Sequence, residues 1–254
     1  SLSLLDWQDE VYRTAIVQDY SLSVSGATEN INYLFSGGYL NQEGLATGTG
    51  YERFSFRTNV ESKINKYLAI GINLAPTYIV TNMSGRANGK DSQAHKALAS
   101  TPVSEPGVGY MTLVQPNERY GWADSNSSPS YILNTNIHQN RTLRMVGNAF
   151  ARITPFEDFR VELSAAANYV DLDNSTYSFS SAGSKWPNGE GQSSSGAHNT
   201  SRIWSTLLQA VANYDHTFDK HGVSAMVGFS SEESSLGFKT EQSFSSPFPN
   251  DLIT

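Results

Sequence analysis

Polar and apolar residues alternate one by one along most of this chain, and this two-residue period restricts its fold more than any other feature. Such a period places successive side chains on opposite faces of an extended strand, whereas a helix needs a period near 3.6. In 51–62, for example, Phe54 and Phe56 fall on the face opposite to Arg57. The pattern predicts an all-β, antiparallel chain, with strands at about 16–26, 31–41, 51–62, 67–81, 139–153, 158–175, 202–217 and 222–240.

The connections between these eight strands alternate in length. Short links are expected near 26–30, 62–66, 155–158 and 219–221, and long ones at 42–50, 82–138 and 176–201. Membrane β-barrels have short periplasmic turns at one rim and long extracellular loops at the other. Each strand also reaches the roughly 9–11 residues that a tilted spanning strand needs. We therefore expect a segment of a transmembrane β-barrel with long extracellular loops.

The positions of the charged residues within the alternation support this hypothesis. In lipid every backbone N–H and C=O must be paired, so strands cross only as a closed sheet with its charged side chains turned inward. An Arg that faced lipid at mid-depth would cost roughly 2–4 kcal/mol. The residues expected to face the lumen are Arg53, Arg57, Glu61, Arg144, Arg152, Arg160 and Glu162.

A soluble β-sandwich that binds carbohydrate is the alternative, because its strands alternate in the same way. In that fold the apolar face of each strand packs into a dry protein core. The two hypotheses therefore differ in what covers the apolar side chains.

Composition excludes several classes of function. The net charge of -7 argues against a nucleic-acid partner, and the absence of cysteine excludes disulfides and thiolate chemistry. The five histidines are scattered, so we expect no metal and no cofactor. Carboxylate pairs such as Glu232 and Glu233 occur, but no pattern indicates a buried site with a converging nucleophile and base. We therefore expect that the chain is not an enzyme.

Aromatic residues in the expected long loops are the candidates for contact with a ligand or a partner, because flat rings stack on sugars and grip peptide side chains. The longest loop also contains a helix-forming stretch, 91–100, with Asp91 as a candidate N-cap and Pro102 beyond its end. The contact candidates are Tyr110, Tyr120, Trp122, Tyr131, Tyr177 and Trp186.

Several stretches resemble the SusC/RagA family of TonB-dependent outer-membrane transporters from Bacteroidetes. The specific part lies in the first 80 residues, and the remainder matches in layout more than in motif. The matching stretches are DWQDEVYRTA at 6–15, YSLSVSG at 20–26, FSGGYLNQEG at 35–44 and GYERF at 50–54, with ALASTP at 97–102 and FPND at 248–251.

The resemblance implies a 22-stranded barrel plugged by an amino-terminal domain, in the outer membrane of a Gram-negative bacterium. It implies import of oligosaccharides or peptides, with a SusD-like lipoprotein as the lid and energy from the TonB complex. Residues 1–254 are then expected to be part of one barrel domain in contact with membrane lipid, with the plug absent from this chain.

Overall fold

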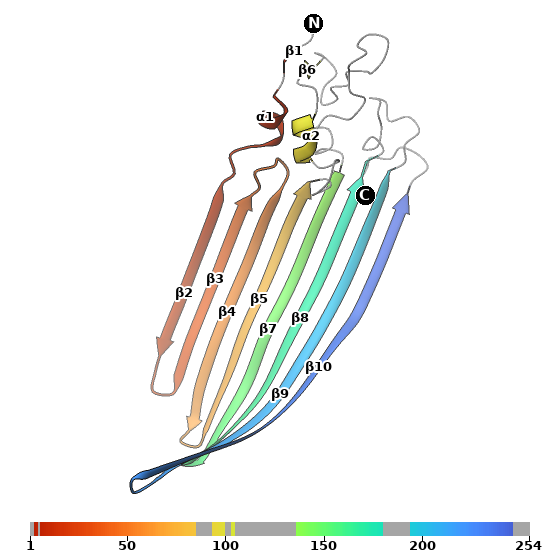
Figure 1. Ribbon diagram of the computed structural model, residues 1–254. Helices are drawn as coiled ribbons and strands as arrows, with labels where there is room; N and C mark the ends of the chain where they lie inside the picture. Colours follow the sequence, from red (N-terminus) through yellow and green to blue (C-terminus); the bar gives the residue numbers. More distant parts are fainter. Residues whose placement is uncertain are drawn as a thin grey trace.

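The computed structural model describes residues 3–4, 6–84, 93–99, 103–104, 136–179 and 194–245. Most of this part is one sheet of eight long strands that run side by side (Figure 1). The strands are β2 (Val17–Ala27), β3 (Ile31–Glu43), β4 (Gly50–Asn65), β5 (Leu68–Ser84), β7 (Asn136–Phe156), β8 (Phe159–Ser178), β9 (Ser195–Phe218) and β10 (His221–Ser245).

The sheet is antiparallel throughout, in the order β10-β9-β8-β7-β5-β4-β3-β2. Each long strand pairs with the next long strand of the chain, and in the described residues β2 and β10 form the two edges. Two short strands, β1 (Ser3–Leu4) and β6 (Val103–Ser104), pair separately. The all-β, antiparallel architecture with about eight strands that the alternation predicts is confirmed.

The later strands are longer than the alternation indicates. The structure extends β9 over 24 residues and β10 over 25, whereas the sequence indicates 202–217 and 222–240. Near the ends of these strands both faces carry polar residues, so the hydropathy signal fades. The backbone ladder continues regardless, because hydrogen bonding between main chains does not depend on side-chain polarity.

Short turns close the hairpins at one end of the sheet, which is the lower end in Figure 1. The hydroxyl of Thr28 accepts from the backbone N–H of Ile31 at 3.0 Å, and Asn65 Oδ1 accepts from the backbone N–H of Tyr67 at 2.8 Å. Asp219 in the last turn has φ of 52°, a left-handed conformation that Asp tolerates better than most residues. At the other end, residues 85–135 separate β5 from β7 in the sequence.

Two short helices pack together at the end of the sheet opposite these turns. The stretch expected to be helical at 91–100 contains α2 (Gln93–Ala99), and α1 (Trp7–Val11) precedes the first long strand. Trp7, Val11 and Ala97 are buried together. In the described residues neither helix has the length or the apolar character needed to cross a membrane.

The apolar face of the sheet has no second layer over it in the described ranges. Phe54, Ile72 and Leu163 point from this face and are 47%, 42% and 45% exposed. A β-sandwich would bury these side chains against a second sheet about 10 Å away. The soluble sandwich that the sequence left open therefore does not fit the described part of the chain.

Glycines leave room for large rings that reach over them from neighbouring strands. The ring of Phe150 on β7 lies over Gly71 on β5, where a Cβ atom would collide with it. The ring of Tyr33 covers Gly26 in the same way. Rings placed over a glycine shield backbone that would otherwise lack side-chain contacts.

We predict that Gly71→Val displaces the Phe150 ring and lowers the free energy of unfolding by about 1–2 kcal/mol, as overpacking does. Urea titration of the refolded protein in detergent measures this loss. Gly222→Val is the matched control, because a Cβ at Gly222 would meet nothing within 4 Å. The loss should shrink in a Phe150→Ala background, and equal losses in both backgrounds would contradict the explanation.

Candidate functional site

The strand register places all seven charged residues expected to share a face on the same side of the sheet. On β4, Glu61 lies opposite Gly71 of β5, which lies opposite Phe150 of β7. On β7 and β8, Arg152 lies opposite Glu162. We call this side the polar face, and the side that carries Phe54, Ile72 and Leu163 the apolar face.

An ion triad connects three strands on the polar face. Arg152 Nε lies 3.1 Å from Glu162 Oε2, and Arg152 Nη1 lies 3.1 Å from Glu61 Oε1. To reach Glu61, Arg152 crosses β5 at Ala69, beside the Phe150 ring that covers Gly71. The three side chains are 33–40% exposed, so water screens their attraction.

Amide side chains continue the polar face toward the end of the sheet that carries the helices. Asn73 Nδ2 donates to Asn148 Oδ1 at 2.8 Å, and Arg144 Nε donates to Asn168 Oδ1 at 3.3 Å. Sequence reasoning did not single out these asparagines as site residues. In the sequence these asparagines occupy polar positions of the alternation, and many serines and threonines occupy such positions too. Amides and guanidinium groups together offer donors and acceptors to a hydrated ligand.

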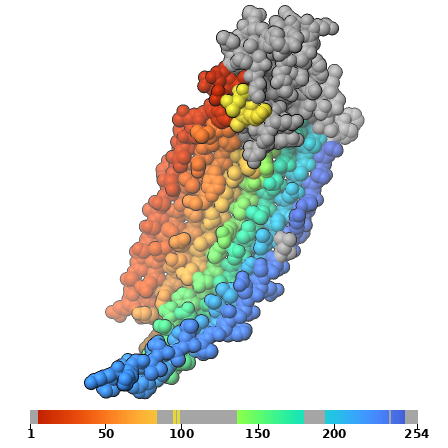
Figure 2. Space-filling model, in the orientation of Figure 1, coloured from red at the N-terminus to blue at the C-terminus, as the bar shows by residue number. Residues whose placement is uncertain are grey.

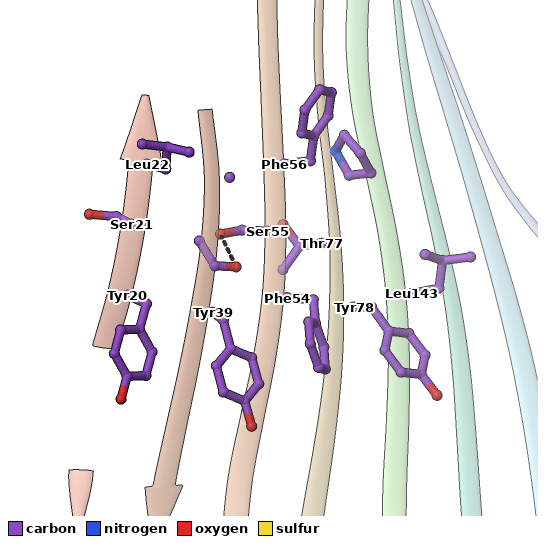
Figure 3. A pocket seen from close by; sticks show the side chains of 13 residues that line it. Tyr20, Ser21, Leu22, Tyr39, Phe54, Ser55, Phe56, Thr77, Tyr78 and Leu143 are labelled. Carbon is purple, nitrogen blue, oxygen red and sulfur yellow. Dashed lines mark hydrogen bonds between the residues drawn. The ribbon is translucent and has the colours of Figure 1, made fainter. Parts of the chain in front are cut away.

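The apolar face carries a row of aromatic rings that crosses four strands. Tyr20, Tyr39, Phe54 and Tyr78 lie at paired positions on β2, β3, β4 and β5. The rings of Tyr20 and Tyr39 stack at 6.5 Å, and those of Tyr39 and Phe54 lie 4.8 Å apart. In Figure 3 the three tyrosine hydroxyls point the same way, away from Leu22. The row is therefore amphipathic, with its polar atoms along one edge.

Two ion pairs on the apolar face lie level with this row or beyond it, toward the end that carries the helices. Arg202 Nε lies 3.2 Å from Asp171 Oδ2, which also accepts from the hydroxyl of Tyr169 at 3.2 Å. His198 Nε2 lies 3.3 Å from Asp173 Oδ2. These contacts hold charge where the strands leave the apolar zone. In the described residues, no group of three or more histidines and carboxylates is arranged to hold a metal ion.

Lys239 and Glu241, near the end of β10, form a separate ion pair at 2.7 Å. The Lys239 ammonium holds the pKa of the Glu241 carboxyl below its ordinary value, through a hydrogen bond and through charge attraction. Both side chains are more than half exposed.

Tyr177 is the one loop aromatic among the contact candidates that the structure describes, and its expected position in a loop is wrong. It lies within β8, because the ladder with β7 and β9 continues to Ser178. Its ring contacts Phe179 at 5.1 Å and Phe244 at 6.0 Å. The remaining candidates, Tyr110, Tyr120, Trp122, Tyr131 and Trp186, lie outside the described residues.

The geometry is that of a barrel wall, and solved structures share it. The chain superposes on a structure of the RagAB peptide transporter with a TM-score of 0.76 and 21% identity, covering 98% of this chain and 27% of that one. A RagAB peptide importer in a closed-closed state gives a TM-score of 0.71 at 18% identity, covering 96% and 30%. Figure 2 shows the corresponding continuous surface from β2 to β10.

Curated relatives point to the same class. TonB-dependent receptor P3 of Formosa agariphila is 25% identical over 243 residues, which cover 89% of this chain and 22% of the receptor. TonB-dependent receptor SusC of Bacteroides thetaiotaomicron is 27% identical over 103 residues, covering 41% and 9%. No protein-family model matches the chain. The chain spans less than a quarter of the length of these two relatives.

The fold therefore defines a segment of a transmembrane β-barrel wall. The resemblance to the SusC/RagA family is confirmed, and the chain is similar to a barrel segment of the TonB-dependent receptors of that family.

We predict that Arg152→Met lowers the free energy of unfolding in detergent by about 1 kcal/mol at low salt, because two partly exposed ion pairs are lost and two carboxylates stay close together. High salt should shrink this loss, because it screens the charges. Arg160→Met is the matched control, since Arg160 lies on the same face without a salt bridge in the described part. A loss that is equal at both salt concentrations would contradict an electrostatic role.

Proposed function

We propose that this chain crosses the bacterial outer membrane as part of a TonB-dependent importer, with the apolar face in lipid and the polar face toward the lumen. The observation that carries the proposal is an exposed apolar face bounded by aromatic rings. Without a second protein layer over the described face, hydrocarbon is the environment that suits those side chains.

The length of the apolar zone supports this orientation. On β8 the zone runs from Phe159 to Tyr169, and on β9 from Trp204 to Tyr214, with an aromatic ring at each end. Both segments have about eleven residues, the length at which a tilted strand crosses the hydrocarbon core. Rings at both ends match the interfacial girdles of outer-membrane barrels. The polar extensions of β9 and β10 would then project beyond the bilayer.

Closure of the barrel follows from the same environment. The outer edges of β2 and β10 carry backbone groups without a partner strand in the described residues. In lipid such groups cost several kcal/mol each, so further strands must pair with both edges. The proposed whole is the 22-stranded, plugged barrel that the family resemblance implies.

The cargo we propose is an oligosaccharide or a peptide, and the partners are a SusD-like lipoprotein lid and the TonB complex. The RagAB structures, which are named as a peptide importer and a peptide transporter, support the peptide class, and the oligosaccharide class comes from the family resemblance. The amide and guanidinium groups of the polar face can bind either hydrated cargo. We propose transport without chemical conversion, because the relatives are receptors and transporters.

The orientation in the membrane predicts different effects for arginine substitutions at two neighbouring residues. Leu163→Arg would place a charge in lipid and should lower the free energy of unfolding from phospholipid vesicles by roughly 2–4 kcal/mol. Ser164→Arg, its neighbour on the polar face, should change that free energy by less than about 1 kcal/mol. Urea titration of the vesicle-embedded protein measures both values. Equal effects would exclude the proposed assignment of the two faces.

Growth on defined nutrients tests which class of cargo the protein imports. We expect that deleting the gene for the full-length protein abolishes growth on either a peptide mixture or a glycan as the limiting nutrient, while growth on simple sugars persists. Growth is the readout, and inactivating TonB in the same strain should give the same defect. A strain that grows normally on both nutrients would contradict a role in import.

A further inference from the structure

We infer that a groove on the apolar face, centred on Gly37, holds the acyl chain of an anionic, phosphate-bearing lipid from the outer leaflet. This inference rests on the proposed function, because it needs the apolar face to lie in the bilayer. It adds one preferred lipid position to a face that would otherwise contact lipid uniformly.

The groove exists because one side chain is missing from a crowded face. Gly37 lies opposite Leu22 on β2 and opposite Phe56 on β4, and a Cβ at Gly37 would meet nothing within 4 Å. The resulting hollow has a volume of about 600 Å³. The pyrrolidine ring of Pro76 on β5 lines it on the far side of Phe56. Figure 3 shows Leu22 and Phe56 on either side of the hollow.

The lining of the groove suits a hydrocarbon chain. None of the residues that line it is charged, and its large side chains are tyrosines, phenylalanines and leucines. Ser21, Ser55 and Thr77 border the groove only through the strand backbone, because the alternation turns their side chains to the polar face. A peptide strand would leave its own backbone groups unpaired in this groove, whereas an acyl chain has none to pair.

The direction of the lipid follows from the aromatic row. The hydroxyls of Tyr20, Tyr39 and Tyr78 point away from the hollow (Figure 3), toward the end where β2 begins and where Figure 1 shows the helices. In a membrane such hydroxyls lie at the level of the headgroups. The acyl chain would therefore run from the tyrosine row down past Gly37, with its headgroup beyond the hydroxyls.

A cation is available at that end of the groove. Arg141 lies on the apolar face of β7, two residues beyond Leu143, which lines the groove. Two residues of strand span roughly 7 Å, about the offset between a headgroup and the first part of its chain. Arg141 is exposed, and no salt bridge joins it to another residue of the described part.

In the described residues no acidic neighbour forms a salt bridge with Arg141. Asp173, opposite Arg141 on β8, contacts His198 and accepts from Ser175 at 3.2 Å. Glu52 shares the same row but is separated from Arg141 by Val80 of β5. An anionic phosphate is therefore a suitable partner for Arg141, through charge-assisted hydrogen bonds.

Photolabelling of the full-length protein tests the inference. The protein is placed in phosphatidylcholine nanodiscs that contain a small fraction of phosphatidylglycerol with a diazirine in its acyl chain. After irradiation, labelled peptides are quantified by mass spectrometry. We expect labelling at Leu22 and Phe56 to exceed that at Val227, an exposed apolar-face residue of β10, by roughly tenfold.

Two variants separate the parts of the site. Gly37→Phe fills the groove and should reduce its labelling to the level at Val227, whereas Gly222→Phe, also a glycine with open space around it, should leave labelling unchanged. Arg141→Gln keeps the groove but should abolish its preference for phosphatidylglycerol over phosphatidylcholine with the same diazirine. This headgroup readout does not depend on Gly37→Phe folding correctly.

Three results would overturn the inference. Equal labelling at Leu22 and Val227 would mean that the face contacts lipid without a preferred position. Groove labelling that Gly37→Phe and Arg141→Gln both leave unchanged would mean that the groove does not select the lipid. Protection of Leu22 and Phe56 from labelling in nanodiscs that hold two protein copies would mean that a second copy occupies the groove. If no apolar-face residue is labelled at all, the chain does not face lipid, and the proposed function itself fails.

Discussion

Backbone hydrogen bonding is the constraint on which the rest of this structure depends. A strand that crosses hydrocarbon must pair every N–H and C=O with its neighbours, and the antiparallel ladder does so from β2 to β10. Side chains are then free to differ completely between the two faces, since none of them is needed to satisfy the backbone. The sheet can therefore be exposed to lipid on one side and to water on the other without a conventional protein core.

Stability within the sheet comes from contacts between neighbouring strands. On the apolar face, rings pack beside rings and over glycines, as Tyr33 does over Gly26. On the polar face, Arg152 connects Glu61 and Glu162 across an intervening strand that carries small residues there. Both kinds of contact depend on large and small side chains lying opposite each other, which only the correct register provides.

The sequence predicts the strands and the faces because period two is a local property. It does not reveal the ion triad, since Glu61 and Arg152 are far apart in the chain and meet only through the register of β5. The groove at Gly37 is hidden for the same reason. Helix α1 had a readable signal that the alternation obscured, because Asp6 caps it and accepts from the backbone N–H of Gln8 at 2.9 Å. The polar extensions of β9 and β10 lack any hydropathy contrast.

The shared burial of Trp7, Val11 and Ala97 has a mechanical consequence. Pulling α1 away from α2 would expose two large apolar side chains, at about 1.5–3 kcal/mol each. The segment before β2 is also held to the β3–β4 connection, where Tyr12 bridges Ala46 and Arg13 N–H donates to the carbonyl of Leu45 at 2.9 Å. A force applied to the chain ahead of β2 would thus be transmitted to two separate connections at that rim before it reached the sheet.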